Sequence, residues 1–181
     1  MRIVGGTHKG RRISVPNNFP SRPTTDYAKE GLFNVLDHQI DLTNLTVLDL
    51  CSGTGNIALE FLSRGVNNVI SVDINTNCLR FIQKNAESLL VSDRIKTIKS
   101  DIFNYVKQSS DKFDIIFADP PFAFSDYHAL IELIFEKGML VENGIFILEH
   151  GKQKTFHEEL NYSFFRNYGN VTFSFFKLTE K

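Results

Sequence analysis

The sequence has 181 residues, which is enough for one compact domain with a sizeable core. Hydrophobic residues make up 42% and charged residues 23% of the chain, as in a globular protein, and we expect most of its 17 phenylalanines in the core. The net charge of −1 excludes a chain that binds nucleic acid through bulk charge alone.

The cysteines, the histidines and the apolar runs exclude further classes. Cys51 and Cys78 form neither a C-x-x-C pair nor a disulfide framework, which indicates a reducing compartment and argues against structural zinc. The five histidines have no ligand spacing, so we expect no metal. No segment has the apolar core of a signal peptide or the roughly 18 apolar residues of a membrane span. We expect a cytoplasmic protein that acts as a monomer, away from membranes.

The N-terminal segment is basic although the chain is nearly neutral. Residues 1–25 contain five basic and no acidic side chains, which leaves 15 basic and 21 acidic residues elsewhere. The five are Arg2, Lys9, Arg11, Arg12 and Arg22. Such an arm can neutralise phosphates, and Gly5, Gly6 and Gly10 would let its backbone approach a partner closely. The alternative is a solvated basic hairpin.

The remaining pattern alternates between helices and strands. A helix is predicted from residue 24, capped by Thr24 or Thr25. Strands are predicted at 46–52, 69–73, 95–101, 113–118 and 144–149, with helices between them at 56–65, from 75, after 101 and at 125–137. Residues 162–178 hold two aromatic-rich runs around a Tyr-Gly-Asn turn, which predicts a hairpin.

These elements predict one α/β unit. Its sheet is expected to be doubly wound, Rossmann-like, mostly parallel and seven-stranded, with a C-terminal antiparallel hairpin and a small N-terminal β-hairpin and helix extension. We expect residues 1–40 to form this basic arm and helix at the rim of the site, and residues 41–181 to form the main domain.

The first predicted strand leads into a glycine-rich turn. Gly53, Gly55 and Ala58 match G-x-G-x-x-A, a pattern that serves nicotinamide, flavin and S-adenosylmethionine cofactors alike and that also occurs as a plain tight turn. Asp49 lies four residues before Gly53, and its negative charge would repel a pyrophosphate. S-adenosylmethionine carries a sulfonium and an ammonium group, so Asp49 favours this cofactor.

Two more acidic residues end the next two strands, where such sheets bind ligands. Asp73 can accept hydrogen bonds from ribose hydroxyls, and Asp101 can accept from the adenine amino group with Ile102 against the ring. Each could instead be only a helix N-cap. Three acids facing one crevice nevertheless predict an adenosyl cofactor, and we place further contacts at Thr25, Ser52 and Ile74.

The fourth strand ends in Asp119-Pro120-Pro121-Phe122. Proline fixes φ and holds the preceding residue extended, so this loop is stiff. A nucleobase amine is a poor nucleophile because its lone pair is delocalised into the ring. The Asp119 carboxylate and the Pro120 carbonyl can accept its two N–H bonds and aim the lone pair at a methyl donor, while Phe122 stacks on the base. The alternative is a turn with a purely structural role.

These motifs resemble the RsmD family, bacterial guanine-N2 methyltransferases of 16S ribosomal RNA. The likeness covers nearly the whole chain and rests on R-I-V-G-G with K-G-R, R-P-T-T-D from residue 22, D-L-C-S-G-T-G, D-P-P-F and the Y-G hairpin. It implies S-adenosylmethionine as cofactor and 16S ribosomal RNA, in the small subunit or its assembly intermediate, as substrate. It places the RNA near Arg2, Lys9, Arg11, Arg12, Arg22 and Pro121. Residues 153–163 resemble the family least, and no function is carried over to them.

Three other functions remain open from the sequence. The same loop chemistry suits another planar amine, adenine N6 in nucleic acid or a protein glutamine amide. An RNA-binding assembly factor without turnover would not need the intact Asp119-Pro-Pro-Phe loop. A nicotinamide oxidoreductase is disfavoured by Asp49 and by the absence of an evident hydride-transfer site in the sequence.

Overall fold

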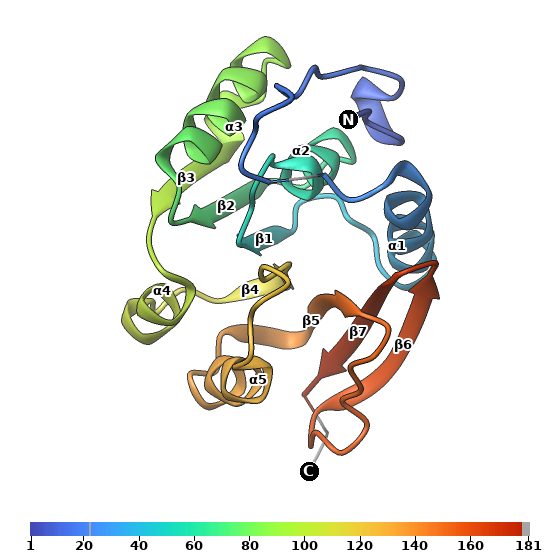
Figure 1. Cartoon of the computed structure of the whole chain (residues 1–181), viewed down its shortest axis with the longest axis vertical. Coiled ribbons are helices and arrows are strands. Elements are labelled where there is room, and N and C mark those ends of the chain that lie inside the picture. The colour runs from blue at the N-terminus through green and yellow to red at the C-terminus, as the bar shows by residue number, and fades with distance from the viewer. Residues whose placement is uncertain (22, 179–181) are drawn as a thin grey trace.

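The computed structural model describes residues 1–21 and 23–178, which fold around a sheet with helices on both faces (Figure 1). The strand order is β3-β2-β1-β4-β5-β7-β6. The strands are β1 Thr46–Leu50, β2 Asn68–Asp73, β3 Ile95–Lys99, β4 Phe113–Ala118, β5 Leu140–Gly151, β6 Tyr162–Tyr168 and β7 Val171–Lys177. The helices are α1 Asp26–Gln39, α2 Asn56–Ser63, α3 Thr76–Ser88, α4 Ile102–Gln108 and α5 Tyr127–Glu136, with short 3-10 helices at Gly6–His8 and Ser92–Arg94.

The strand pairing confirms the predicted α/β fold. Strands β3, β2, β1, β4 and β5 are parallel, and β7 pairs antiparallel with both β5 and β6. The order reverses between β1 and β4, which is where open α/β sheets bind ligands. Strand β5 is longer than predicted because Leu140 already pairs with Phe113 before a bulge shifts the register.

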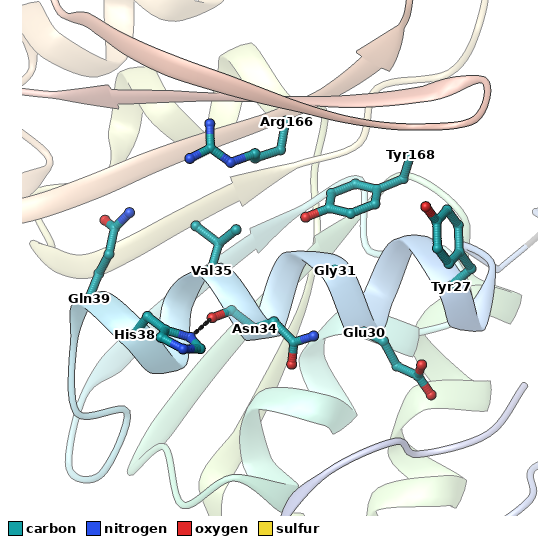
Figure 2. Close-up of a pocket in the computed structure, with 9 residues that line it drawn as sticks. All are labelled: Tyr27, Glu30, Gly31, Asn34, Val35, His38, Gln39, Arg166 and Tyr168. Carbon is teal, nitrogen blue, oxygen red and sulfur yellow. Dashed lines mark hydrogen bonds between the residues drawn. The ribbon is translucent and has the colours of Figure 1, made fainter.

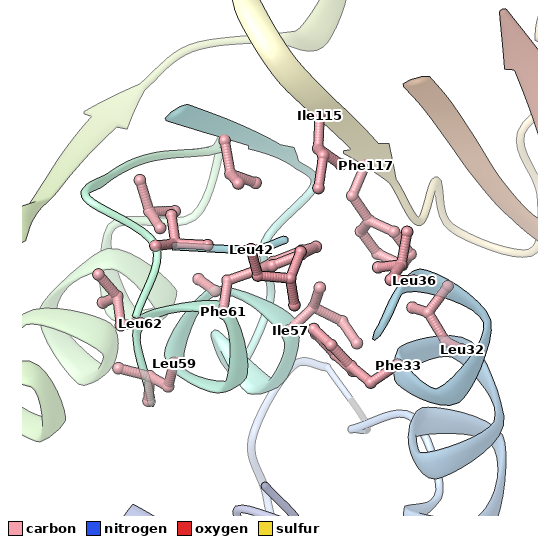
Figure 3. Packing of buried hydrophobic residues seen from close by; sticks show 14 of the residues in the cluster. Leu32, Phe33, Leu36, Leu42, Ile57, Leu59, Phe61, Leu62, Ile115 and Phe117 are labelled. Atoms are coloured by element: carbon pink, nitrogen blue, oxygen red, sulfur yellow. The ribbon is translucent and has the colours of Figure 1, made fainter. Parts of the chain in front are cut away.

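Two hydrophobic layers cover the two faces of the sheet. One packs α1, α2 and α3 against β1 and β4, and Figure 3 shows Leu36 and Phe33 of α1 beside Phe61 of α2 and Phe117 of β4. The other packs α4 and α5 against the opposite face. Nine of the 17 phenylalanines are buried, as expected from the composition.

The N-terminal arm forms a small hairpin with one antiparallel bridge, between Arg2 and Arg12. Two of its three glycines, Gly5 and Gly6, pack against the end of α2, whereas a Cβ on the exposed Gly10 would meet nothing within 4 Å. Gly6 has a φ of +70°, and a Cβ there would lie 1.8 Å from the Ser63 carbonyl oxygen at the end of α2. A Cβ on Gly5 would lie 2.2 Å from the Arg64 guanidinium. Both glycines therefore allow the arm to pack on α2.

A buried ion pair fastens the arm to α1 and α2. Lys29 and Glu60 are both fully buried, with 3.2 Å between Nζ and Oε2. The Lys29 ammonium also donates to the Arg2 carbonyl at 2.6 Å and to Asn56 Oδ1 at 2.7 Å, while Glu60 accepts from the Val4 amide at 2.9 Å. Burial lowers the pKa of Lys29, and Glu60 opposes that shift. Arm and helices thus share one hydrogen-bonded core, and the division at residue 40 stays a prediction.

Helix α1 also packs on the C-terminal hairpin. Figure 2 shows Tyr168 of β6 directly above Gly31, where a Cβ would lie 2.1 Å from the tyrosine ring. Tyr27 meets Tyr168 edge to face, with 5.7 Å between ring centroids. A shallow groove of about 440 Å³ runs between these two elements, away from the carboxyl ends of the parallel strands.

Across residues 1–21 and 23–178, no helix combines the length and apolar character that crossing a membrane requires. Within the same residues, no group of three or more histidine, cysteine, aspartate or glutamate side chains is arranged to hold a metal ion.

Candidate functional site

A crevice of about 590 Å³ opens at the carboxyl ends of β1, β2 and β4. This volume is in the range of pockets that bind small molecules. Its walls include the predicted Gly53, Asp73, Asp101 and Asp119. The structure thus brings Asp73, Asp101 and Asp119 together in one crevice, whereas Asp49, the third acid of the expected set, does not line it.

The glycine-rich turn forms the floor of the crevice. Gly55 is the N-cap of α2 with a φ of +70°, and a Cβ there would lie 2.6 Å from Ile82 of α3. Glycine is required at this position for the left-handed turn and for close helix packing. Gly55 lines neither cavity of the site, whereas Gly53 does line the crevice and donates its amide to Asp73 Oδ2 at 2.9 Å.

The two acids of the neighbouring strands differ in their local bonds. Asp73 does not cap a helix, since Asn75 is the N-cap of α3; its two oxygens accept from the Gly53 and Asn75 amides. Asp101 is the N-cap of α4, and its Oδ1 accepts from the amides of residues 103 and 104. Ile74, 66% exposed, and the buried Ile102 line the crevice beside these acids.

Asp49 lies in a second, smaller cavity behind the crevice. Its carboxylate is buried, and Oδ2 has no hydrogen-bond partner among the described residues. The cavity of about 20 Å³ is also lined by Ser52, whose hydroxyl donates to backbone carbonyls, and by Ser21, Cys51 and Asp119, which line the crevice as well. The two cavities therefore meet at Asp119. An unpartnered buried carboxylate with room beside it fits a small cationic group.

The loop after β4 forms the opposite wall. The Asp119 amide donates to the Leu50 carbonyl at 3.2 Å, and the Phe124 amide donates to the Pro121 carbonyl at 2.8 Å. Pro120 is buried, whereas the Phe122 ring is 97% exposed at the rim of the crevice. Phe124 packs edge to face on Tyr127, with 5.0 Å between centroids. The loop is anchored at both ends and offers one free aromatic face.

Burial makes two acids of the site, Asp119 and Asp49, hard to ionise. Desolvation raises the pKa of Asp119 to about 7. It also raises the pKa of Asp49 well above the ordinary range, with further contributions from the charges of Asp119 and Asp73. The pKa of the Cys51 thiol is raised by burial and by the same acids, so this thiol stays neutral. A cationic ligand in these cavities would favour the ionised carboxylates.

Some predicted residues lie outside the two cavities. The hydroxyl of Thr25 caps α1 by accepting from the Ala28 amide, and Arg2 forms ion pairs with Asp26 and Glu30. Lys9, Arg11 and Arg12 are exposed on the arm, and Pro121 lines the crevice. The prediction for Arg22 lies outside the described residues.

Sequence reasoning missed Glu149 at the end of β5. Its side chain is buried and accepts from the Thr24 hydroxyl at 3.2 Å. Burial raises the pKa of Glu149 well above its ordinary range, with the neighbouring Asp119 charge as the next cause. The signal was present, because Glu149 ends a predicted strand just as Asp73 does. Thr24 therefore contacts Glu149 through its hydroxyl and Asn56 through its carbonyl. It also lines the smaller cavity together with Ser21 and Pro23.

Comparison with known proteins agrees with the geometry. A family model described as conserved hypothetical protein 95 matches residues 1–177. The ribosomal RNA small subunit methyltransferase D of Haemophilus influenzae is 32% identical over 85% of this chain and 80% of its own length, and that of Escherichia coli is 30% identical over 82% and 74%. A solved Escherichia coli structure named yhhF, 27% identical, covers 97% of this chain and 96% of its own with a TM-score of 0.83. The chain therefore belongs to the family of conserved hypothetical protein 95, the RsmD family that its motifs resemble.

Proposed function

We propose that this protein transfers a methyl group from S-adenosylmethionine to the exocyclic N2 amine of a guanine in 16S ribosomal RNA. The observation that carries the proposal is the position of Asp119. It stands where the acid-lined crevice meets the Asp49 cavity, and the exposed Phe122 ring lies at the rim. Family membership and the names of the relatives support ribosomal RNA as the substrate class.

The crevice suits the cofactor through three groups of residues. The unpartnered Asp49 Oδ2 would hold the ammonium of its methionine part, in a cavity large enough for about one small polar group. Asp73 would accept from the ribose hydroxyls, and Asp101 and Ile102 would hold the adenine. The bound cofactor supplies an electrophilic methyl group on a sulfonium.

The loop after β4 would hold the substrate amine. Asp119 and the Pro120 carbonyl accept its two N–H bonds, which orients the nitrogen lone pair and is the proximity route to catalysis. Asp119 is then placed to take the proton that the methylated nitrogen releases. Phe122 provides a stacking surface worth about 1–3 kcal/mol for a base that has left the RNA helix.

The basic arm is proposed to hold RNA at the rim. Lys9, Arg11 and Arg12 are exposed and form no ion pair among the described residues, so they remain available to phosphates. The substrate is then the small subunit or its assembly intermediate, modified in the cytoplasm by a monomer of this chain.

The test is methyl transfer to small-subunit particles from cells that lack the enzyme. Purified protein with isotopically labelled S-adenosylmethionine should methylate one guanine of 16S ribosomal RNA at N2, as read by nuclease digestion and mass spectrometry. Particles that already carry the modification are the control and should take up no label. A product methylated at another atom of the base would contradict the guanine-N2 assignment.

A second candidate rests on the same loop. The acceptors at Asp119 and Pro120 fit any planar amine, which includes adenine N6 and a protein glutamine amide. Label recovered in N6-methyladenine or in a ribosomal protein, with none in 16S guanine, would favour this candidate.

A further inference from the structure

The segment between β5 and β6 forms a polar cleft of about 110 Å³. Two lysines, Lys152 and Lys154, line it together with His157, the hydroxyl of Thr155 and the amide of Asn167. No carboxylate lines the cleft, although acids outnumber basic residues in the chain outside the arm. A concave site with cations and neutral hydrogen-bonding groups fits a phosphate.

No carboxylate neutralises either lysine among the described residues. Both lysines are exposed. Residues 150–157 contain no acid. Three glutamates flank this segment: Glu149 is buried and accepts from the Thr24 hydroxyl, Glu159 is paired with His128, and Glu158 has no ion pair among the described residues.

The polar residues at the floor of the cleft already form hydrogen bonds with one another or with the backbone. His150 is buried; its Nδ1 lies 2.9 Å from the Gly151 carbonyl oxygen and its Nε2 lies 2.8 Å from Ser174 Oγ. Burial lowers the pKa of His150, so the ring stays neutral near pH 7. The Asn167 amide donates to Thr172 at 2.9 Å. The cleft therefore has a fixed shape, and its charge comes from the lysines.

Aromatic contacts join the cleft to the loop after β4. The Lys154 ammonium lies 5.1 Å from the centroid of the Tyr127 ring. Phe156, which also lines the cleft, lies 5.7 Å from the same ring, and Tyr127 in turn contacts Phe124, which lines the crevice. In Figure 1 this segment runs beside β6 and β7 in the lower part of the view, while the basic arm lies at the top.

The acids of the crevice make a separate phosphate site necessary. Asp73, Asp101 and Asp119 line the crevice, and a sugar-phosphate backbone cannot lie over them without repulsion. A target base must therefore reach in while its flanking phosphates are held at the rim by cations. In the proposed function the basic arm supplies such cations, and a second set is needed for the phosphates that the arm does not hold.

We propose that the cleft between β5 and β6, through Lys152 and Lys154, binds a phosphate of the substrate RNA strand flanking the target nucleotide. This inference rests on the proposed function and names the second RNA contact of the same site. It gives a role to Lys152 and to Lys154, of which Lys154 lies in residues 153–163, to which the family resemblance carries over no function.

The test compares two double variants that remove the same charge. Lys152→Ala with Lys154→Ala removes the cleft cations. Lys96→Ala with Lys112→Ala removes two exposed lysines beside another cavity, at the amino ends of β3 and β4. Each protein is titrated with unmodified small-subunit particles and with protein-free 16S ribosomal RNA at several salt concentrations.

The cleft variant should bind both RNAs about 10-fold more weakly near 0.15 M salt, and its slope of log affinity against log salt should fall by about 0.7–0.9, the contribution of one phosphate contact. Its affinity for S-adenosylmethionine and its unfolding temperature should match the wild type. The control variant should keep most of the wild-type affinity and slope.

Three results would overturn the inference. The first is a cleft variant that binds RNA like the control variant while the wild type methylates 16S RNA, which leaves the proposed function standing. The second is weaker binding to particles with unchanged binding to protein-free RNA, which would make the cleft a contact for a ribosomal protein. The third is a wild type that neither binds nor methylates ribosomal RNA, in which case the proposed function fails as well.

Discussion

The two walls of the crevice are built in opposite ways. The cofactor wall, formed by the glycine-rich turn, Asp73 and Asp101, satisfies much of its polarity within the chain: Gly53 donates to Asp73, and Asp101 caps α4. The substrate wall, formed by residues 119–124, leaves its groups unused. Phe122 is 97% exposed, and the Asp119 carboxylate has a pKa raised to about 7 by burial.

The cofactor wall is therefore preorganised, whereas the substrate wall has polar and aromatic groups that still lack a partner. The cofactor wall needs no rearrangement to offer its remaining lone pairs, because backbone amides already fix both acids. The substrate wall contains a desolvated carboxylate, Asp119, and a solvent-exposed ring, Phe122. Both are stabilised only when a ligand covers them. Substitutions on the substrate wall should therefore lower turnover, and substitutions on the cofactor wall should weaken the binding of the cofactor.

The largest effect is expected at Asp119. Asp119→Ala removes the acceptor that orients the amine and takes its proton, so kcat should fall by about 10² to 10⁴. The affinity for S-adenosylmethionine, measured by calorimetry, should stay near normal. Asp126→Ala removes an exposed carboxylate near the same loop and should leave kcat unchanged. An Asp119→Ala enzyme with wild-type turnover would remove the amine-holding role.

A smaller effect is expected at Phe122. Phe122→Ala removes the stacking surface, which is worth about 1–3 kcal/mol, so KM for RNA should rise by about 5- to 150-fold. Phe122→Tyr keeps the ring and should retain most of the affinity. Leu90→Ala shortens another exposed apolar side chain, 88% exposed after α3, and should change nothing. If Phe122→Ala leaves KM for RNA unchanged, the base does not stack on this ring.

The raised pKa of Asp119 predicts a pH profile. Because Asp119 must be ionised to take a proton, kcat/KM should fall as pH drops below about 7, by up to about tenfold per unit. Replacement by asparagine removes the group that titrates, so the residual activity of Asp119→Asn should lack this slope. A wild-type profile that is flat between pH 5.5 and 8 would contradict the assignment.

The raised pKa of Asp119 has the opposite effect on stability: activity should rise with pH, whereas the free energy of unfolding should fall. The folded pKa of about 7 lies above the ordinary value of 3.8, so the folded state binds more protons between these values. The contribution of Asp119 to stability is present below pH 3.8 and is lost as pH rises through 7. Asp119→Asn should therefore unfold at a higher temperature than the wild type at pH 8, with a smaller difference at pH 5. Equal unfolding temperatures at both pH values would contradict the shift.

The sequence predicted the crevice because parallel strands end at one edge, so an acid at each strand end must face the same space. The same rule applies to Glu149 at the end of the fifth predicted strand, whereas the predicted site includes acids from the first four strands only. Other features depend on distant contacts that no local pattern reports. Gly6 packs on Ser63 rather than on RNA, and the buried Lys29 finds Glu60 only after α1 and α2 are packed.

The smallest effect decides between two roles of Asp101 that the sequence left open. As the N-cap of α4, its carboxylate is replaceable by an asparagine amide oxygen, whereas alanine should lower the free energy of unfolding by about 1 kcal/mol. As a partner of the adenine amino group, it must present a second acceptor, and the amide of asparagine presents a donor instead. Asp101→Asn should thus keep the wild-type unfolding free energy in urea while its affinity for S-adenosylmethionine falls severalfold. Asp101→Ala should lose both. If Asp101→Asn binds the cofactor like the wild type, Asp101 is only a helix cap, and Asp73 of the cofactor wall and Asp49 of the smaller cavity remain as the acids proposed to hold the cofactor.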